Sequence, residues 1–112
     1  MRIPGADRAV VEPAKVRDYR RSESHPVGRF KAKFFAALGY SRGNWEELAA
    51  ALRDLATEDA ALGQPSPFGQ KFEVRARIQG PSGRVAPLVV VWMVRSTEDF
   101  PRFVTAYPGA GT

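Results

Sequence analysis

The chain has 112 residues, of which 17 are Lys or Arg and 12 are Asp or Glu, so its net charge is +5 and its isoelectric point is about 10.1. This length predicts a single domain, residues 1–112, with one hydrophobic core. The absence of cysteine excludes disulfide scaffolds, thiol catalysis and cysteine zinc sites, and it fits the cytoplasmic localisation that we expect. No apolar run is long enough for a secretory signal or a membrane span, so we expect no membrane contact.

The charges are unevenly distributed along the chain. Residues 1–42 carry a net charge of +6, residues 43–70 a net charge of −4, and residues 71–112 a net charge of +3. This distribution indicates one positive face built from the two ends of the chain, with an acidic segment between them.

Two helical patterns lie in the first third of the sequence. Residues 12–19 predict a helix of about two turns, because Pro13 suits the first helical position. A second helix begins at Pro26 or Val27, and Gly39 ends it as a left-handed cap. Its apolar stripe consists of Phe30, Phe34, Ala37 and Leu38.

A third helix follows, and we expect it to form a hairpin with the second. Asn44 opens it, and Glu47 three residues later completes a signal that resembles a capping box. One side of this helix is apolar and consists of Trp45, Leu48, Ala49, Leu52 and Leu55.

The pattern then changes from helical to extended. Residues 60–70 are rich in Gly, Pro and Ser, which predicts a loop. From Phe72 to Ile78 apolar residues alternate with polar ones, which predicts a strand with one buried face. Residues 80–83 read as a turn.

The last third predicts two more strands. Residues 88–94 are apolar on both faces, as in a central strand, and Pro87 marks the expected start of regular pairing. Residues 96–101 form the next reversal, and residues 103–107 form a last strand. The sequence therefore predicts an α+β fold, in which an amino-terminal helical hairpin packs on an antiparallel meander of three to four strands.

The only histidine, His25, stands at the entrance of the second helix. Arg29, Lys31 and Lys33 follow within two turns, where cations oppose the helix dipole unless an anion is bound. Free backbone amides and cations together form phosphate sites. The alternative is that His25 caps the helix and the cations are solvated, and the spacing leaves both interpretations open.

Two pairs of polar residues share strand faces. Arg75 and Arg77 lie on one side of the first predicted strand, where they either contact a nucleic-acid backbone or are simply solvated. Thr105 and Tyr107 share a face of the last strand. Their hydroxyls can bind a phosphate or transfer a proton, but both residues are also ordinary strand formers.

Several chemistries are not expected. One histidine, no cysteine and no acidic cluster of ligand spacing predict neither a metal site nor a cofactor. The chain contains no Gly-x-Ser-x-Gly elbow and no Gly-x-x-x-x-Gly-Lys-Ser/Thr phosphate loop.

Segments spread over the whole chain resemble a family of small uncharacterised bacterial proteins, whose related domains also occur at the ends of polymorphic toxins. The matching segments read Arg2-Ile3-Pro4, Asp7-Arg8-Ala9, His25-Pro26-x-Gly28-Arg29-x-Lys31-Ala32, Phe35-x-Ala37-Leu38-Gly39, Glu98-Asp99-Phe100-Pro101-Arg102 and Thr105-Ala106-Tyr107. More distantly, the early His/Arg/Lys group and the late Thr-Ala-Tyr-Pro strand look like the barnase, EndoU, colicin and RelE-like ribonuclease superfamily.

The distant resemblance implies cleavage of RNA without a metal, through a 2′,3′-cyclic phosphate. His25 would then be the general acid or base, while Arg29 and Lys31 would stabilise the charge on the phosphoryl oxygens. Thr105 would assist them, and Tyr107 would be a proton donor or a stacking surface. Lys33, Arg75 and Arg77 are the expected nucleic-acid contacts. The sequence offers no second histidine or clearly placed glutamate as the partner in proton transfer.

A second hypothesis is a non-catalytic interaction module, which is a partner or accessory protein. It needs only the basic surface, and it also admits RNA or a protein partner of the immunity or antitoxin type. The sequence leaves the oligomeric state open. The ribonuclease hypothesis additionally predicts that His25 converges with Thr105 and Tyr107 on one electropositive pocket.

Overall fold

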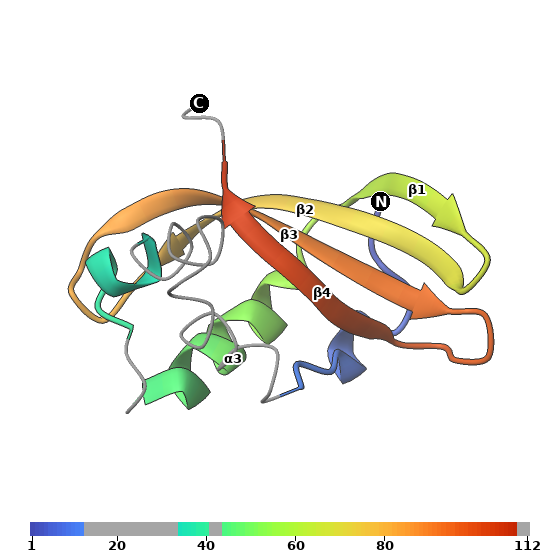
Figure 1. Ribbon diagram of the computed structural model, residues 1–112, viewed down its shortest axis with the longest axis horizontal. Helices are drawn as coiled ribbons and strands as arrows, with labels where there is room; N and C mark the ends of the chain where they lie inside the picture. The colour runs from blue at the N-terminus through green and yellow to red at the C-terminus, as the bar shows by residue number, and fades with distance from the viewer. Residues whose placement is uncertain (13–33, 41–43, 110–112) are drawn as a thin grey trace, which may run out of the picture.

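Four antiparallel strands and the helix α3 (Trp45–Leu55) form the framework of the part of the chain that the structure describes. The computed structural model describes residues 1–12, 34–40 and 44–109 (Figure 1). Its elements are the 3-10 helix η1 (Ala6–Arg8), a helical turn over residues 34–37, α3 (Trp45–Leu55), β1 (Ala61–Ser66), β2 (Gly69–Gln79), β3 (Val85–Arg95) and β4 (Pro101–Pro108). The strands form one sheet in the order β1-β2-β3-β4, and every pair is antiparallel. The predicted α+β fold is confirmed.

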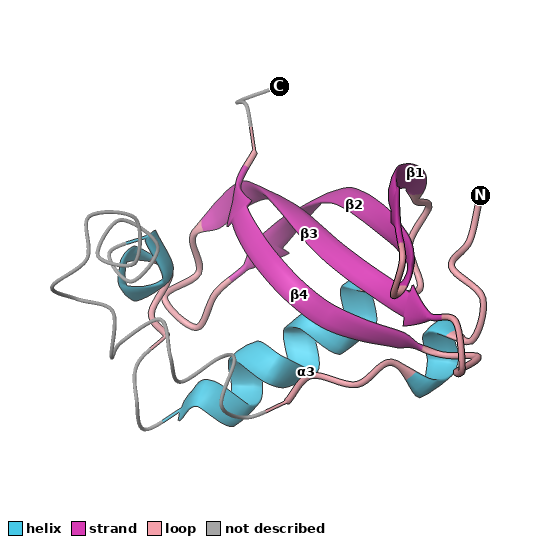
Figure 2. Ribbon diagram, turned by 45° about the vertical axis from the view of Figure 1, so that its right-hand side comes forward, coloured by secondary structure: helices cyan, strands magenta, loops and turns pink. Residues whose placement is uncertain are grey.

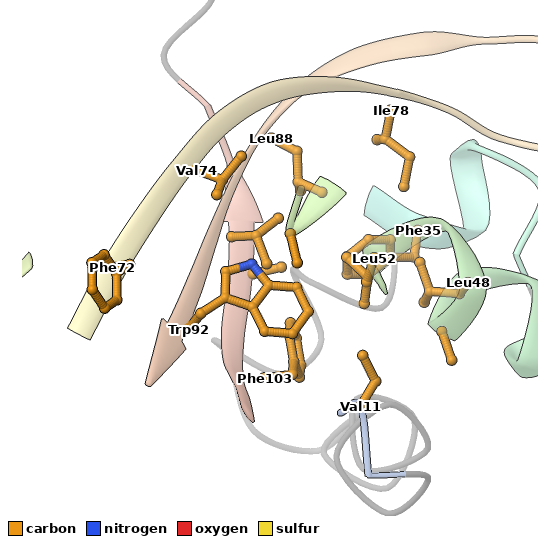
Figure 3. Close-up of a cluster of buried hydrophobic side chains, with 14 of the residues drawn as sticks. Val11, Phe35, Leu48, Leu52, Phe72, Val74, Ile78, Leu88, Trp92 and Phe103 are labelled. Carbon is orange, nitrogen blue, oxygen red and sulfur yellow. The ribbon is translucent and has the colours of Figure 1, made fainter. Parts of the chain in front are cut away.

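The sheet has one covered face. The helix α3 crosses beneath it (Figure 2), and we call the face toward α3 the inner face and the opposite one the outer face. The core lies between the two layers (Figure 3). Its largest fully buried members are Leu52 from the helix and Val74, Leu88, Val90 and Trp92 from the sheet, each at most 1% exposed. Burial of such side chains stabilises the fold by roughly 1.5–3 kcal/mol each.

The helical part of the prediction is confirmed where the structure describes it. Leu48, Ala49 and Leu52 are buried on one side of α3. Gly39 has a φ of +96°, the left-handed conformation expected of a helix cap. Asn44 differs from the prediction: its side chain makes no cap bond, and its Nδ2 donates to the Gly39 carbonyl at 3.0 Å.

The predicted helix over residues 12–19, apart from Glu12, and the start of the second helix lie outside the described residues. The described end of that second helix packs through Phe35 and Leu38, which are 4% and 3% exposed. Phe34 is only partly buried against the core. Within the described part of the chain, no helix is long and apolar enough to cross a bilayer.

The prediction of a loop over residues 60–70 is wrong, because six of these residues form β1. The strand lies at the edge of the sheet, where Pro65 can be accommodated without a ladder hydrogen bond. The register shifts between Leu62 and Pro65, and the Gln70 side chain donates to the Gly63 carbonyl at 3.0 Å within this irregularity. Proline, glycine and a bulge together hide the alternation that marks an ordinary strand.

The two later strands are longer than predicted. β3 is the central strand, as expected, but its pairing with β2 begins at Val85, two residues before Pro87. β4 begins at Pro101 and pairs with β3, with a register shift between Val91 and Trp92 that leaves Val104 as the extra residue. Below this bulge Phe103 faces the core, and above it Ala106 does.

The amino-terminal segment borders β4. Val10 forms a parallel bridge with Arg102: its amide donates to the Pro101 carbonyl at 3.0 Å, and the Phe103 amide donates to the Val10 carbonyl at 2.9 Å. Nearby, the Arg8 guanidinium pairs with the Asp99 carboxylate at 3.1 Å. The first residues of the chain therefore cover an edge of the sheet that would otherwise expose its backbone groups.

Candidate functional site

The outer face of the sheet holds a cluster of polar side chains from two strands. Alternation along β2 places Glu73 and Arg75 on the outer face, because Val74 between them is buried on the inner face. Alternation along β4 places Thr105 and Tyr107 on the outer face in the same way, because Ala106 between them is buried. We call these four residues the outer-face site. They stand on the two neighbours of the central strand β3.

The strand register arranges the outer-face site in two rows. In the first row Glu73 and Thr105 flank Val91, their common partner on β3. In the next row Arg75 and Tyr107 flank Val89 in the same way. The strands of such a sheet are about 4.8 Å apart and same-face residues about 7 Å apart, so the four side chains outline a patch of roughly 10 by 7 Å. That is about the size of one nucleotide.

The floor of the patch is apolar. Val89 is only 1% exposed although it lies on the outer face, so other atoms cover it, and Val91 is partly buried. Both belong to β3, which is hydrogen-bonded on both sides. A site on the middle of a sheet holds its side chains in fixed relative positions, which is a requirement for both recognition and catalysis.

The arginines that the structure describes differ in their partners. Arg8, Arg95 and Arg102 form ion pairs with Asp99, Glu98 and Glu12. Arg75 and Arg77 are exposed, and within the described residues no ion pair involves them or Glu73. An exposed guanidinium can bind an anionic ligand, and a phosphate is an anion that matches its planar donor geometry.

The arrangement combines complementary chemical groups. A carboxylate can accept a proton, a guanidinium can stabilise negative charge, and a phenol or hydroxyl can donate a hydrogen bond. Glu73, Arg75 and Tyr107 supply these three functions beside an apolar floor. No group of three metal-ligating side chains occurs among the described residues.

Four of the eight predicted site residues lie in the part of the chain that the structure describes. Thr105, Tyr107 and Arg75 lie together in the outer-face site, and the exposed Arg77 lies one row beyond it, opposite Pro87. The other predicted site residues, His25, Arg29, Lys31 and Lys33, lie outside the described residues. Their convergence with the hydroxyl pair stays a prediction.

Glu73 is not among the predicted site residues. The signal was present, because the alternation from Phe72 to Ile78 places Glu73 on the same face as Arg75 and Arg77. What the sequence lacked was the register, which brings Glu73 into one row with Thr105 through Val91. Lys71 was also missed; it lies on the same face, opposite Met93.

The segment Glu98-Asp99-Phe100-Pro101-Arg102 has a structural role. Glu98 and Asp99 accept hydrogen bonds from Arg102 and Arg8, and the Arg102 guanidinium lies 5.2 Å from the centre of the Phe100 ring. These contacts fix the β3–β4 turn against the amino-terminal segment. The motif that supports the family resemblance thus includes residues that hold the fold together.

Comparisons with known proteins extend these observations. A chain of a solved contact-dependent growth inhibition toxin–immunity protein complex from Klebsiella pneumoniae 342 has a similar fold, with a TM-score of 0.73. The two chains are 21% identical, and the alignment covers 95% of this chain and 97% of that one. No curated protein matches by sequence. The family model described as a domain of unknown function, DUF6883, matches residues 2–110. The chain therefore belongs to the DUF6883 family.

Proposed function

We propose that this chain is a toxin-related domain that cleaves RNA phosphodiester bonds without a metal ion. The observation that carries the proposal is the outer-face site, in which Glu73 and Arg75 face Thr105 and Tyr107 across β3. A carboxylate, an exposed guanidinium and two hydroxyls on a patch of nucleotide size match the needs of phosphoryl transfer.

The reaction is transfer of the phosphoryl group to the neighbouring 2′-hydroxyl. A general base removes the proton of the 2′-hydroxyl, and the freed oxygen forms a bond to the adjacent phosphorus. The bond between phosphorus and the 5′-oxygen breaks, and this oxygen takes a proton from a general acid. The products are a 2′,3′-cyclic phosphate and a free 5′-hydroxyl.

The residues divide these tasks by their chemistry. Glu73 and His25 serve as the base and acid, because carboxylate and imidazole both exchange protons in water. Arg75, together with Arg29 and Lys31, stabilises the charge that develops on the phosphoryl oxygens. Thr105 donates a hydrogen bond to the same oxygens, and Tyr107 donates a proton or stacks on a base.

The structural neighbour supports the toxin-related part of the proposal. That neighbour is a chain of a contact-dependent growth inhibition toxin–immunity protein complex, and the alignment spans nearly all of both chains. The complex pairs a toxin with an immunity protein. We therefore propose a partner of the immunity type for this chain as well.

The test is cleavage of RNA by the purified full-length chain in EDTA, with analysis of the product ends. We expect 2′,3′-cyclic phosphate ends. His25→Ala should lower the cleavage rate by about 10²–10⁴-fold, because it removes a residue that transfers a proton. Thr105→Ala should lower the rate less, because it removes a residue that only binds. Thr57→Ala, at the end of α3 and away from the outer face, is the matched control. Undiminished cleavage by His25→Ala would remove that residue from the mechanism.

One observation favours a second candidate function, binding of RNA without cleavage. Arg75 and Arg77 are exposed on a sheet face and suit contacts to a nucleic-acid backbone. This alternative expects binding that weakens steeply with salt, no product at any RNA concentration, and no effect of His25→Ala on affinity. It describes an accessory module rather than an enzyme.

A further inference from the structure

The strand β1 presents an unusual edge. It is the end strand of the sheet, and no described strand pairs with its outer edge. Its residues are mostly exposed, and no charged side chain occurs between Asp59 and Lys71. Exposed edges are normally protected by charged side chains, prolines or bulges, because unpaired backbone groups attract a further strand. β1 has Pro65 and a register shift but no charged side chain.

The exposed apolar side chains gather around this strand. Four large apolar side chains are exposed among the described residues, and three of them are Met1, Leu62 and Phe68. Leu62 belongs to β1 and is 60% exposed, and Phe68, 72% exposed, forms the tip of the β1–β2 hairpin. Met1 lies next to the start of β1, because the Ala60 amide donates to its carbonyl. Figure 1 shows the amino terminus beside β1.

The two sides of the edge differ in chemistry. Leu62 pairs with the buried Phe72, so it continues the apolar inner face. On the outer face Gly63 lies close against Lys71, because an added Cβ would come within 3.2 Å of the Lys71 Cβ. Lys71 is followed on that face by Glu73 and then by the exposed Arg75 and Arg77.

We propose that β1 is the docking edge for an acidic protein partner that adds one extended strand to the sheet. The added strand places apolar side chains over Leu62 and acidic side chains toward Lys71, so it alternates between the two types. Pro65 has no amide hydrogen, which restricts pairing to residues 61–64. Such a partner would also shield the outer-face site, and this part of the proposal rests on the proposed function. The addition of a strand to β1 does not depend on it.

Charge argues against a second copy of this chain as the occupant. Antiparallel pairing of two β1 strands would form a continuous sheet with both outer faces on the same side. It would therefore bring two sets of Lys71, Arg75 and Arg77 onto one surface, and each copy already carries a net charge of +5. Like charges on one surface oppose association, whereas an acidic strand is attracted to it.

The test uses the full chain and a synthetic peptide of alternating valine and glutamate, with a peptide of alternating valine and lysine as its counterpart. Affinity is measured by titration, and amide hydrogen exchange locates the bound strand. We expect the acidic peptide to bind and to slow the exchange of amides in residues 61–64. Leu62→Lys should weaken this binding by about tenfold, as for a central interface residue.

Two further variants separate the proposal from its alternatives. Lys71→Glu should weaken the binding of the acidic peptide and strengthen the binding of the basic one. Val85→Lys is the control, because Val85 is apolar and 53% exposed, similar to Leu62. It pairs with Gln79 at the end of β2 that is remote from the hairpin tip. This substitution should leave the affinity for the acidic peptide within about twofold. Equal binding of both peptides, unchanged exchange in residues 61–64, or a dimer that Leu62→Lys dissociates would overturn the proposal. Because no RNA is present, this result is independent of the cleavage assay.

Discussion

The guanidinium of Arg102 binds both carboxylate oxygens of Glu98, with two N–O distances of 2.8 Å. The same guanidinium donates to Glu12 at 3.2 Å, so one side chain joins the β3–β4 turn to the amino-terminal segment. The hydrogen bond from Arg102 is the main reason why the pKa of Glu98 lies below its ordinary value. Reciprocally, the bond to Glu98 raises the pKa of Arg102. This bidentate pair is the best-defined ionic contact of the fold.

The pair predicts an acid-sensitive contribution to stability. Because the pKa of Glu98 is lowered in the folded chain, its contribution is fully present above the ordinary carboxyl value of 4.5 and is lost as the pH falls below it through the lowered pKa. Arg102→Gln should therefore lower the free energy of unfolding at neutral pH. In acid the free energies of unfolding of the variant and the wild type should come closer together. Denaturant titrations over this pH range measure the difference, with the exposed Arg84→Gln as control. A difference independent of pH would contradict this account.

Gly80 marks a second contact that the fold requires. A Cβ at this position would overlap the carbonyl oxygen of Leu38, so the turn after β2 can approach the end of the helical turn over residues 34–37 only without a side chain. Gly80→Ala should destabilise the chain by about 2–3 kcal/mol, the upper range for overpacking. Gly83→Ala is the control, because nothing lies within 4 Å and only its left-handed backbone, with a φ of +88°, opposes the change. Thermal denaturation of both variants shows whether Gly80→Ala loses more stability than Gly83→Ala. Equal losses of stability would contradict the steric argument.

Much of the fold follows from local patterns. The apolar stripe of α3 and the alternation in β2 were sufficient to locate these elements, because each buries one face against a single neighbour. β1 could not be recognised, because Pro65 and a register shift at an edge strand remove both the composition and the period that identify strands. The edge pairing of Val10 with β4 was equally hidden, since a single bridge has no period.

The candidate site was only partly predictable for a different reason. Arg75, Thr105 and Tyr107 could be assigned to strand faces from alternation alone. Which of them lie together depends on the register between strands, and the bulge at Val104 shifts this register by one residue. Strict alternation would place Thr105 and Tyr107 on the same face as the buried Phe103. The bulge places them on the outer face instead, where Thr105 shares a row with Glu73.

Glu73 provides a test of the proton-transfer mechanism. Glu73→Gln keeps the size and hydrogen-bonding capacity of the side chain but removes its ability to accept a proton, so RNA cleavage should fall by about 10²–10⁴-fold. Affinity for RNA should be retained or increased, because a negative charge near the phosphates is removed. Glu58→Gln, an exposed residue after α3, is the matched control. A parallel loss of cleavage and affinity would instead assign Glu73 to the structure of the site.

Salt dependence distinguishes a specific outer-face interaction from general attraction to a basic protein. Each phosphate contact on a single strand contributes about −0.7 to the slope of log K against log salt, so Arg75→Gln should make the slope shallower by about that amount. Arg53→Gln removes the same charge from the exposed side of α3, on the opposite layer, and should leave the slope unchanged. Binding titrations at several salt concentrations measure both slopes. If the two variants reduce the slope equally, the outer face has no special role, because the net charge alone would then account for the attraction.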